Sequence, residues 1–499
     1  MKICETVMTT TLAGLRAGRD AASAPSRAGR IALVELRLDG LAPGELDVAG
    51  ALADRQLPVI VTCRPTWEGG AFNGSERDRL RVLSEAVRLG AEFVDIEMEA
   101  ETRTPGVVTG LTSGQRSQTR VVVSHHDFSP GVPKDLVSRV RVMRACGDAL
   151  GTGTVVKVAI MAARPRDCAT LRRALYGEGM PEGSVAIAMG PAGVLSRLLP
   201  AKFSNEWTYA GSAAPGQLSV DDVIARYRVA DATAATRVFG IAGAPLGHSA
   251  SPAMHAAAFA AAGIDAVFVP VETADAAELL EIADVLDFEG LSITAPLKAR
   301  VFGRPHVHVD AASRAIGAIN TLRRHEGGGW DGRNFDAPSF RAPLEQLAIA
   351  VRGHRVVVLG AGGAARAAVR ELLAMGAQVE IAARDFTQAT MLAEEAGATV
   401  TSWPPTGDAA LVVNATPVGT APRVHESPIA RGTLHAEVAY DLVYNPQDTQ
   451  FLQDARATGA RTIGGMAMLA AQARQQFEWW TGTQVDPGVF MRAAQEFIR

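Results

Sequence analysis

Lysine is rare in this chain, and two of its lysines stand where a single amine is able to do chemistry. Lysine and arginine together number 49, yet the lysines are only Lys2, Lys134, Lys157, Lys202 and Lys298. Arginine cannot lose its proton, so it serves neither as an amine nucleophile nor as a tunable acid. Lys157 and Lys298 lie within or just after apolar, strand-like runs. They are candidates for catalysis, although composition alone equally allows chance retention at the surface.

Polar side chains accompany Lys157 in the pattern of a Schiff-base site. They end or interrupt successive apolar runs: Glu35, Arg37, Arg64, Glu68, Asp95, Glu97 and His126. One charge in an apolar strand is usually a structural ion pair, but a series of them at strand ends indicates a site. Desolvation would free the Lys157 amine to attack a ketone, with His126 as the acid and base. Arg64 and Arg197 are suited to clamp a carboxylate.

A (β/α)8 barrel, the TIM-barrel fold, would position these residues. Up to residue 230, amphipathic segments alternate with eight β-branched runs: Ile3–Thr9, Ile31–Leu38, Pro58–Arg64, Phe93–Met98, Arg120–Asp127, Val155–Met161, Val185–Gly190 and Trp207–Gly211. Such a barrel carries its active site at the carboxyl ends of its strands, where the polar residues fall. A doubly wound open sheet is the alternative, and the lack of a glycine-rich turn after the first run disfavours it.

Motifs in this half resemble the type I 3-dehydroquinate dehydratases, in that family's order. They are ELRLD (35–39), TCRPTWEGG (62–70), VDIE (94–97), SHHDF (124–128), VVKVA (155–159), MGPAGVLSR (189–197) and TYAGSAAPGQ (208–217). The resemblance implies that Lys157 forms an imine with the C3 ketone of 3-dehydroquinate. His126 would remove the C2 proton and help the C1 hydroxyl leave, and Glu97 would orient His126. The substrate's carboxylate and hydroxyls would be held by Glu35, Arg37, Arg64, Arg197, Ser212 and Gln217.

A short polar segment, residues 228–237, leads from this half into a second α/β pattern. There the sequence VVVLGAGGAARAAVREL (356–372) runs from a strand through a G-x-G-x-x-A fingerprint into a helix, which is typical of dinucleotide binding. The next apolar run ends before Arg384, which suits the 2′-phosphate of NADP. Asp385 follows at once and could instead serve as the acid that holds the ribose of NAD. We expect NADP, bound through Arg384.

Upstream of the fingerprint, Lys298 follows the run GLSIT (290–294), and Asp336 lies in DGRNFDAPSF (331–340). A Lys–Asp pair would supply a proton to a carbonyl that receives a hydride. Ser249 and Ser251 precede a helix that begins with proline. The local sequence favours a capping role for them, although hydroxyls at that point are also able to hold a carboxylate.

These segments resemble the shikimate dehydrogenase family across residues 237–482. The resemblance extends through NATPVG (414–419), YDLVYNP (440–446) and GGMAMLAAQARQQFEWWTG (464–482). It makes Lys298 and Asp336 the catalytic dyad. It assigns substrate contacts to Ser249, Ser251, Thr294, Asn320, Tyr444 and Gln472. It assigns the cofactor site to Gly360, Gly362, Gly363, Ala364, Arg384 and Thr416.

The second half departs from its family's usual pattern near both ligands. Ser292 stands in place of a common Asn, Ser339 in place of a common Gly, and Ala383 in place of a polar residue. The usual N-T-D triplet reads Asn-Phe-Asp, with the bulky Phe335 beside Asp336. Because the dyad is retained, we expect the reaction class to be kept, while Phe335 alters substrate fit and rate.

Composition limits the classes of partner. The net charge is −4 and no basic block occurs, so binding of nucleic acid or an anionic membrane has little support. The four cysteines lack C-x-x-C spacing, so we expect reduced thiols and no metal. The N-terminus has no long apolar run, and arginine-rich composition suggests a high-GC bacterium. We therefore expect a cytoplasmic enzyme with small-molecule partners; its oligomeric state is not specified by the sequence.

The sequence as a whole predicts an α/β chain in three parts. These are a dehydratase barrel (1–230), a dehydrogenase substrate domain (237–338) completed by C-terminal helices (466–499), and an NADP-binding Rossmann domain (339–465). By its resemblance to the plant-type bifunctional enzymes, the chain would dehydrate 3-dehydroquinate and then reduce the 3-dehydroshikimate formed to shikimate. Two alternatives stay open: a second half that prefers quinate, and a barrel that is only a non-catalytic scaffold.

Overall fold

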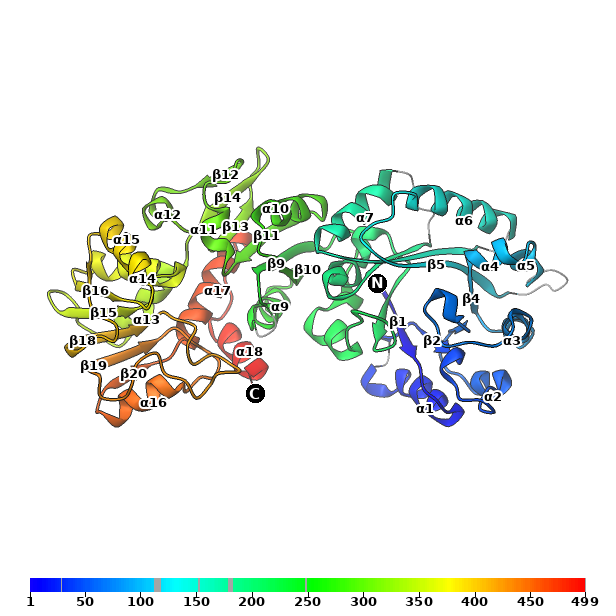
Figure 1. Ribbon diagram of the computed structural model, residues 1–499, viewed down its shortest axis with the longest axis horizontal. Coiled ribbons are helices and arrows are strands. Elements are labelled where there is room, and N and C mark those ends of the chain that lie inside the picture. Colours follow the sequence, from blue (N-terminus) through cyan, green and yellow to red (C-terminus); the bar gives the residue numbers. More distant parts are fainter. Residues whose placement is uncertain (28, 112–117, 151–152, 178–182, 247–248, 499) are drawn as a thin grey trace. The chain divides into compact units, whose positions relative to one another are not determined.

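The computed structural model describes residues 1–27, 29–111, 118–150, 153–177, 183–246 and 249–498. The chain divides into two compact units, each described by itself below. The first unit comprises Met1–Arg237 with Ala277–Asp287, and the second comprises Val238–Ala276 with Phe288–Arg499. In Figure 1 the first unit runs from blue to green along the chain, and the second from green to red.

The first unit is built on eight parallel strands. Their order in the sheet is β7-β6-β5-β4-β3-β2-β1-β8, so β1 to β7 lie side by side in chain order and β8 pairs with β1. The strands are β1 (Lys2–Val7), β2 (Leu33–Arg37), β3 (Val59–Thr62), β4 (Phe93–Glu97), β5 (Arg120–Pro130), β6 (Val155–Met161), β7 (Val185–Met189) and β8 (Trp207–Gly211). All eight predicted runs are strands, and the barrel prediction is confirmed.

Helices connect these strands and cover the outside of the sheet (Figure 1). They are α1 (Leu12–Ala22), α2 (Val48–Leu52), α3 (Glu76–Arg88), α4 (Met98–Arg103), α5 (Val107–Gly110), α6 (Leu136–Leu150), α7 (Arg166–Gly177) and α8 (Val194–Leu198). Local sequence fixes several of their starts. The Ser75 side chain, for example, accepts a hydrogen bond from the Asp78 amide at the start of α3.

A side chain closes the seam between β7 and β8. Asn205, which precedes β8, accepts from the Ala186 amide at 2.7 Å and donates to the Ala186 carbonyl at 3.0 Å. The Glu206 amide donates to the Ser184 carbonyl beside it. The Asn205 carboxamide thus satisfies backbone groups that a ladder partner would otherwise pair.

The barrel interior is apolar in one layer and charged in another. Apolar side chains from alternating positions of the strands, including Leu33, Ile60, Val122 and Trp207, form one buried cluster. Glu35 lies two residues beyond Leu33, on the same face of β2, and it is also buried. Strand periodicity therefore carries charged groups toward the carboxyl ends of the strands, where barrel enzymes bind substrate.

The predicted junction is attached to the first unit over part of its length. Residues Val229–Asp231 form a short 3-10 turn, and Val229 is fully buried. The amino group of Met1 donates to the carbonyls of Ala230 and Ala232 at 2.9 and 3.0 Å. The small residues of this junction allow close packing on the barrel.

The second unit contains two sheets. The first has the order β10-β9-β11-β13-β14-β12, with β13 and β14 antiparallel. Its strands are β9 (Arg237–Gly243), β10 (Ala266–Glu272), β11 (Phe288–Ile293), β12 (Val307–Val309), β13 (Thr321–Arg324) and β14 (Trp330–Arg333). The helices of this part of the unit are α9 (Ser251–Ala261), α11 (Leu297–Val301), α12 (Ala311–Ile316) and α13 (Asp336–Gln346), while α10 (Ala276–Val285) is grouped almost entirely with the first unit.

The second sheet is wholly parallel, with the order β17-β16-β15-β18-β19-β20. Its strands are β15 (Arg355–Leu359), β16 (Gln378–Ala382), β17 (Thr399–Val400), β18 (Gly407–Asn414), β19 (Leu434–Asp441) and β20 (Arg461–Ile463). Its helices are α14 (Gly363–Ala374), α15 (Phe386–Ala396) and α16 (Gln450–Ala457). Numbered along the chain, this is the 3-2-1-4-5-6 order of the Rossmann fold, whose strand order reverses between β15 and β18.

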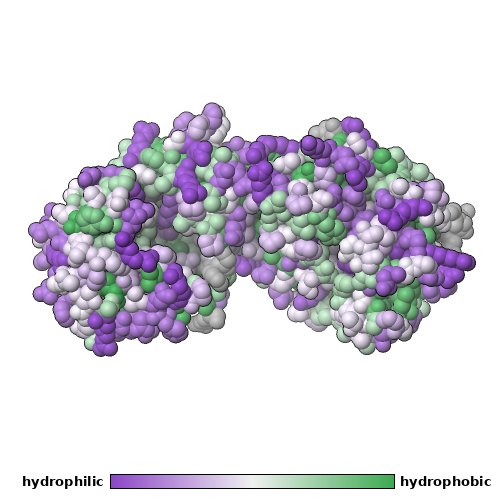
Figure 2. All heavy atoms as spheres, in the orientation of Figure 1, coloured by the Kyte–Doolittle hydropathy of each residue, from purple (hydrophilic) through white to green (hydrophobic). Residues whose placement is uncertain are grey.

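The C-terminal helices α17 (Met466–Thr481) and α18 (Gly488–Ile498) pack against the first of these sheets. Phe477 and Phe490 share one buried cluster with Phe239 of β9 and Phe259 of α9. None of the described helices is long and apolar enough to cross a lipid bilayer. On the face seen in Figure 2 the apolar residues are scattered in small patches among hydrophilic ones.

Candidate active sites

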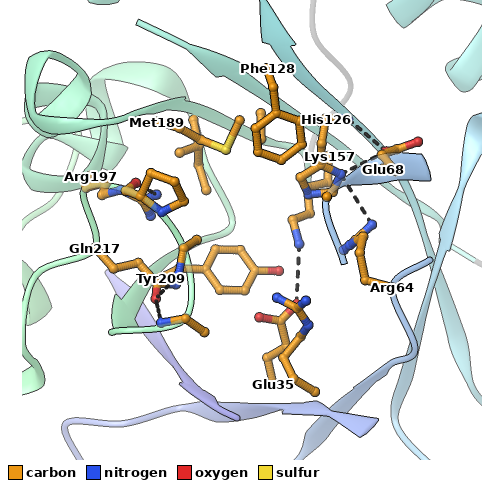
Figure 3. Close-up of a pocket in the computed structure, with 17 residues that line it drawn as sticks. Glu35, Arg64, Glu68, His126, Phe128, Lys157, Met189, Arg197, Tyr209 and Gln217 are labelled. Atoms are coloured by element: carbon orange, nitrogen blue, oxygen red, sulfur yellow. Dashed lines mark hydrogen bonds and ion pairs between the residues drawn. The ribbon is translucent and has the colours of Figure 1, made fainter. Parts of the chain in front are cut away.

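A cavity opens at the carboxyl ends of the barrel strands and contains about 590 Å³ of empty space. Its polar lining includes Glu35, Arg64, His126, Lys157 and Arg197, all predicted from the sequence. One wall is apolar and is formed by Phe128, Ala159, Ile187 and Met189. Figure 3 shows Lys157 and Tyr209 pointing into the space between Arg197 on one side and Arg64 and Glu68 on the other.

The Lys157 amine lies among carboxylates. Its Nζ atom is 3.0 Å from Asp95 Oδ2 and 3.5 Å from Glu35 Oε1. It also lies 4.4 Å from the centroid of the Tyr209 ring. The Lys157 side chain is buried, as its strand context predicts, and β2 and β4 turn their carboxylates into the same layer of the barrel. The lysine is thereby held in a defined place.

His126 is hydrogen-bonded to Glu68, whereas the described contacts of Glu97 are with other groups, and its predicted role in orienting His126 stays a prediction. Glu68 Oε1 lies 2.9 Å from His126 Nδ1 and accepts from the His126 backbone amide at 2.8 Å. Burial, followed by the charges of Arg64 and Lys157, holds the pKa of His126 well below its usual range. We assign the proton to Nδ1, donated to Glu68, which leaves Nε2 as the acceptor. The imidazole is then a neutral base.

Glu97 serves the arginines instead. Its two oxygens accept from Arg64 Nη1 at 2.8 Å and Arg79 Nη1 at 2.6 Å. Arg64 also pairs with Asp95 at 3.0 Å, so both of its terminal nitrogens are used. Burial of Arg64 disfavours its charge, but Asp95 and Glu97 outweigh this and raise its pKa. Arg64 therefore fixes the interior network and has little capacity left for a substrate carboxylate.

Arg197 is the better candidate for that carboxylate. Arg197 is 2% exposed, and it forms no ion pair with any described residue. Its Nη2 atom donates to the Pro215 carbonyl at 3.3 Å. Burial lowers the pKa of Arg197 to about 10. Arg37, by contrast, is paired through two bonds with Asp39. A buried cation with an unused donor at Nε is suited to an anionic ligand.

The other barrel residues predicted to bind the substrate differ in whether they line the cavity. Gln217 lines the cavity and accepts from the Ala213 amide, which holds the loop after β8. Ser212 is exposed and lies outside the described lining, so its role stays a prediction. Tyr209 was missed as a site member, whereas Glu68 and Asp95 belong to the polar series seen in the sequence but were given no role there. These two had a signal: Asp95 shares a strand face with Glu97, and Glu68 follows Arg64 by four residues.

The second unit brings Lys298 and Asp336 together. Lys298 Nζ donates to Asp336 Oδ2 at 2.6 Å, and Asn320 Nδ2 donates to Asp336 Oδ1 at 2.7 Å. Asp336 is the first residue of α13 and 2% exposed, and its amide donates to Asn334 Oδ1. Both carboxylate oxygens are thus held by neighbours. The Lys298 side chain is 18% exposed and is able to meet a ligand.

The predicted substrate residues are grouped unevenly around this dyad. Tyr444 is hydrogen-bonded to the Ser249 side chain and the Ala250 backbone. Ser249 Oγ accepts from the Ser251 amide at 3.3 Å, but the N-cap of α9 is Ala250, so neither serine is the capping residue. Thr294 is half-buried beside Gly243. Gln472 is half-buried on α17, and its role stays a prediction. Residues 247 and 248 of the motif lie outside the described residues.

Two serines that depart from the family pattern, Ser292 and Ser339, accept hydrogen bonds from glutamines of α17. Gln476 donates to Ser292 Oγ at 3.2 Å and to Thr321 Oγ1 at 2.8 Å. Gln475 donates to Ser339 Oγ at 3.1 Å, one turn after Asp336 on α13. These hydroxyls therefore fasten the sheet and α13 to α17.

The bulky Phe335 is also accommodated by α17. Its ring packs edge-on against Trp479, with the ring centroids 5.6 Å apart. Arg323 and Arg333 lie over Trp479, at 4.6 and 4.8 Å from its centroid. The Phe335 amide donates to Asn320 Oδ1. The residue beside the dyad is thus held in place from both its backbone and its ring.

The dinucleotide fingerprint lies where the strand order of the second sheet reverses. Gly360 has φ = +110°, and a Cβ there would lie 3.2 Å from Thr416 Cγ2. Nothing lies within 4 Å of the Cβ position of Gly362, at the start of α14. Ala364 follows in the first turn. A helix N-terminus with open space before it fits a pyrophosphate. Gly363 faces Lys298 instead, since its Cβ would lie 3.2 Å from Lys298 Cδ.

Two residues after β16, Arg384 and Asp385, were candidates to bind the cofactor, and helix capping distinguishes them. Asp385 is the N-cap of α15, and its Oδ1 accepts from the Gln388 amide at 3.1 Å. Arg384 is exposed, and it forms no ion pair among the residues described. Ala383 is buried in the core of the sheet, which accounts for its apolar character. The acid is committed to the helix, while the guanidinium is available to a ligand.

Comparison with known families divides the chain in the same way. Residues 4–233 match the family described as type I 3-dehydroquinase. Residues 241–322 match the shikimate dehydrogenase substrate-binding domain, and residues 347–450 match a putative NAD(P)-binding family.

Individual relatives cover one or both halves. A bifunctional 3-dehydroquinate dehydratase/shikimate dehydrogenase of Arabidopsis thaliana, described as chloroplastic, is 32% identical over 90% of this chain and 77% of its own length. An NADP(+) shikimate dehydrogenase of Anaeromyxobacter dehalogenans is 40% identical over 53% of this chain and 97% of its own. The crystal structure of a Thermus thermophilus shikimate dehydrogenase with NADP(H) and shikimate is 35% identical over 52% of this chain and all of its own, with a TM-score of 0.49.

Proposed function

The chain belongs to the family of bifunctional 3-dehydroquinate dehydratase/shikimate dehydrogenases, and from that premise we propose which side chains carry out its two reactions. The first unit dehydrates 3-dehydroquinate, and the second reduces the resulting 3-dehydroshikimate to shikimate. The observation behind the residue assignment is that each unit holds a lysine within hydrogen-bond distance of a carboxylate, and that His126, bonded to Glu68, lines the same cavity as Lys157.

In the barrel, Lys157 is the nucleophile and His126 the acid and base. The Lys157 amine passes one proton to a neighbouring group and adds to the C3 ketone; that proton then returns to the C3 oxygen, which leaves as water and gives an iminium ion. Nε2 of His126 then removes the C2 proton, and the electron pair left on C2 is stabilised by the iminium. Electrons return to expel the C1 hydroxyl, which leaves as water with the proton from His126. Hydrolysis of the imine releases the product and frees the lysine.

The other polar groups of the barrel orient the substrate. Arg197 binds the C1 carboxylate, because it is a buried cation with an unused donor and no carboxylate partner among the described residues. Glu35, Arg37, Arg64 and Gln217 line the same cavity and accompany it. Ser212 would join them only if the loop after β8 closes on the ligand. Glu68 keeps His126 in the tautomer that the reaction needs.

Borohydride reduction in the presence of 3-dehydroquinate tests the barrel assignment. The reagent should trap the imine as a stable adduct on Lys157, located by peptide mass spectrometry. Lys134→Ala, which removes an exposed lysine of the same unit, should leave the adduct unchanged, while Lys157→Ala should remove it. Absence of an adduct in the unmodified chain would favour the non-catalytic scaffold instead.

In the second unit, Lys298 donates a proton to the carbonyl oxygen while the carbon receives a hydride. Asp336 holds the lysine in place through the 2.6 Å contact and is itself held by Asn320. Ser249, Ser251, Thr294, Tyr444 and Gln472 bind the carboxylate and hydroxyls of the substrate. Hydroxyl groups near the ring favour the flatter shikimate over quinate.

NADPH supplies the hydride when bound, and the residues present fit it. Gly360 and Gly362 let the backbone approach a pyrophosphate at the start of α14, with Gly363, Ala364 and Thr416 beside them. Arg384 is free to meet a 2′-phosphate, whereas Asp385 is used as a helix cap. These features favour NADP over NAD.

Binding of the oxidised cofactors, followed by calorimetry, tests that preference. NADP should bind more tightly than NAD, and Arg384→Ala should remove most of the difference, about tenfold or more. Equal binding of both by the unmodified chain would contradict the assignment. A turnover comparison with shikimate and quinate separates the remaining alternative, since a clear preference for quinate would overturn the substrate named here.

A further inference from the structure

A buried carboxylate in the second unit holds two loops at once. Asp441 is the last residue of β19 and is fully buried. Its Oδ1 accepts from Asn414 Nδ2 and from the Val443 amide, both at 2.9 Å, and its Oδ2 accepts from Thr449 Oγ1 at 2.6 Å. All of these donors are neutral, so the carboxylate is held without a cation.

One arm of this network leads to the cofactor side. Asn414 ends β18 and is the register partner of Asp441. Its Oδ1 accepts from the amide and the hydroxyl of Thr416, at 3.0 and 2.7 Å. The Thr416 methyl group in turn lies against Gly360 of the fingerprint. Asp441 therefore fixes the orientation of the Asn414 carboxamide, which fixes the loop 414–418 beside the cofactor glycines.

The other arm leads to the substrate side. The Val443 amide shares the same oxygen of Asp441, and the next residue is Tyr444. Tyr444 reaches Ser249 and Ala250, at the start of α9. The Val443 carbonyl packs against Gly465, where a Cβ would lie only 2.7 Å away, just before α17. Through its bond to the Val443 amide, Asp441 therefore also fixes the segment 442–444, which includes Tyr444.

A carboxylate in this position is costly for the fold. Burial raises the pKa of Asp441 to about 6, although three hydrogen bonds oppose the shift. A hydrocarbon side chain would avoid the desolvation cost but would leave two amide donors unpaired. A single oxygen that accepts from both loops is the feature that a hydrocarbon cannot supply.

We propose that Asp441 is a positioning residue that holds the cofactor loop (414–418) and the substrate segment (442–444) in one fixed relation, so that disturbing it weakens the binding of both ligands together. The proposal rests on the assignment of Thr416 to the cofactor side and Tyr444 to the substrate side. Hydride transfer requires both ligands at a defined separation, and one shared oxygen sets that separation more tightly than two independent contacts would.

The test is to measure both Michaelis constants of the full chain after Asp441→Ala. The KM for NADPH and the KM for 3-dehydroshikimate should both rise, each by about fivefold or more. Asp441→Asn keeps an oxygen for the two amide donors, so it should recover most of the loss. Thr449→Val is the matched control, because it removes the hydrogen bond to Asp441 Oδ2, which belongs to neither of the two loops. It should lower the melting temperature, since Thr449 caps α16, while leaving both KM values within about twofold.

Two outcomes would overturn the proposal: a rise in only one KM, or a fall in melting temperature with both KM values unchanged. If Asp441→Ala does not fold, Asn414→Ala decides the question. Among the described residues the Asn414 side chain bonds only within its own loop and to Asp441, so a higher KM for 3-dehydroshikimate requires transmission through Asp441. Thr416→Val and Tyr444→Phe test the underlying assignment separately, since the first should change cofactor binding and the second substrate binding.

Discussion

His126 shows how much of a residue's chemistry is set by its immediate neighbours. Burial and two nearby cations keep the imidazole neutral, and burial raises the pKa of Glu68, its Nδ1 partner, to about 8. Below that pH Glu68 is protonated and no longer a full acceptor, whereas above it the carboxylate accepts the Nδ1 proton. We therefore expect kcat/KM for dehydration to rise with pH through about 8, as measured by product absorbance.

Matched variants identify the group responsible for this rise. Glu68→Gln should remove the step and lower the rate by about 100-fold, because the imidazole loses its anionic partner. Glu97→Gln should weaken the arginine network and the thermal stability while leaving the step in place. If instead Glu97→Gln removes the step and Glu68→Gln keeps it, the contact between Glu68 and His126 has no role in catalysis.

Sequence could predict the strand residues of this site but not its loop residue. Period-two alternation places Asp95 and Glu97 on one face of β4, and both are buried in the interior as that pattern requires. Glu68 lies in a 3-10 turn after β3, between Arg64 and a left-handed Gly69. The direction of a side chain in such a turn depends on backbone angles that spacing does not encode. Spacing therefore did not single out Glu68 as the partner of His126, and the role predicted for Glu97 stays a prediction.

At the scale of elements, the start of α14 carries two adjacent glycines that face different surroundings. The strand–turn–helix pattern predicts the fingerprint, and the parallel sheet confirms it. Pattern does not reveal that Gly362 faces open space while Gly363 faces the aliphatic stem of Lys298. That difference depends on how α11 and α14 pack, which is a tertiary contact between segments more than sixty residues apart in the printed sequence.

The two glycines should therefore respond differently to the same substitution. Gly363→Ala places a methyl group 3.2 Å from Lys298 Cδ, which displaces the amine from Asp336. We expect kcat for 3-dehydroshikimate reduction to fall by about tenfold with little change in the KM for NADPH. Gly362→Ala fills the space expected for the pyrophosphate, so it should raise the KM for NADPH instead. Steady-state kinetics with identical effects for both variants would contradict this division.

At the scale of the whole molecule, each catalytic set lies within one unit. Lys157, His126 and Glu68 belong to the first, and Lys298 and Asp336 to the second. The pairwise contacts that define each site are likewise formed inside that unit. Neither reaction therefore depends on a described side chain of the other unit, and the two activities should be separable by single substitutions in the full chain.

A complementation assay examines that independence directly. With 3-dehydroquinate and NADPH, Lys157→Ala should consume no NADPH, yet it should still reduce added 3-dehydroshikimate. Lys298→Ala should accumulate 3-dehydroshikimate, visible by its ultraviolet absorbance, without oxidising NADPH. An equimolar mixture of the two variants should recover NADPH oxidation after a lag, because the intermediate must diffuse between molecules. A mixture that stays inactive would mean that the intermediate reaches the second site only within one chain, which contradicts two self-contained sites.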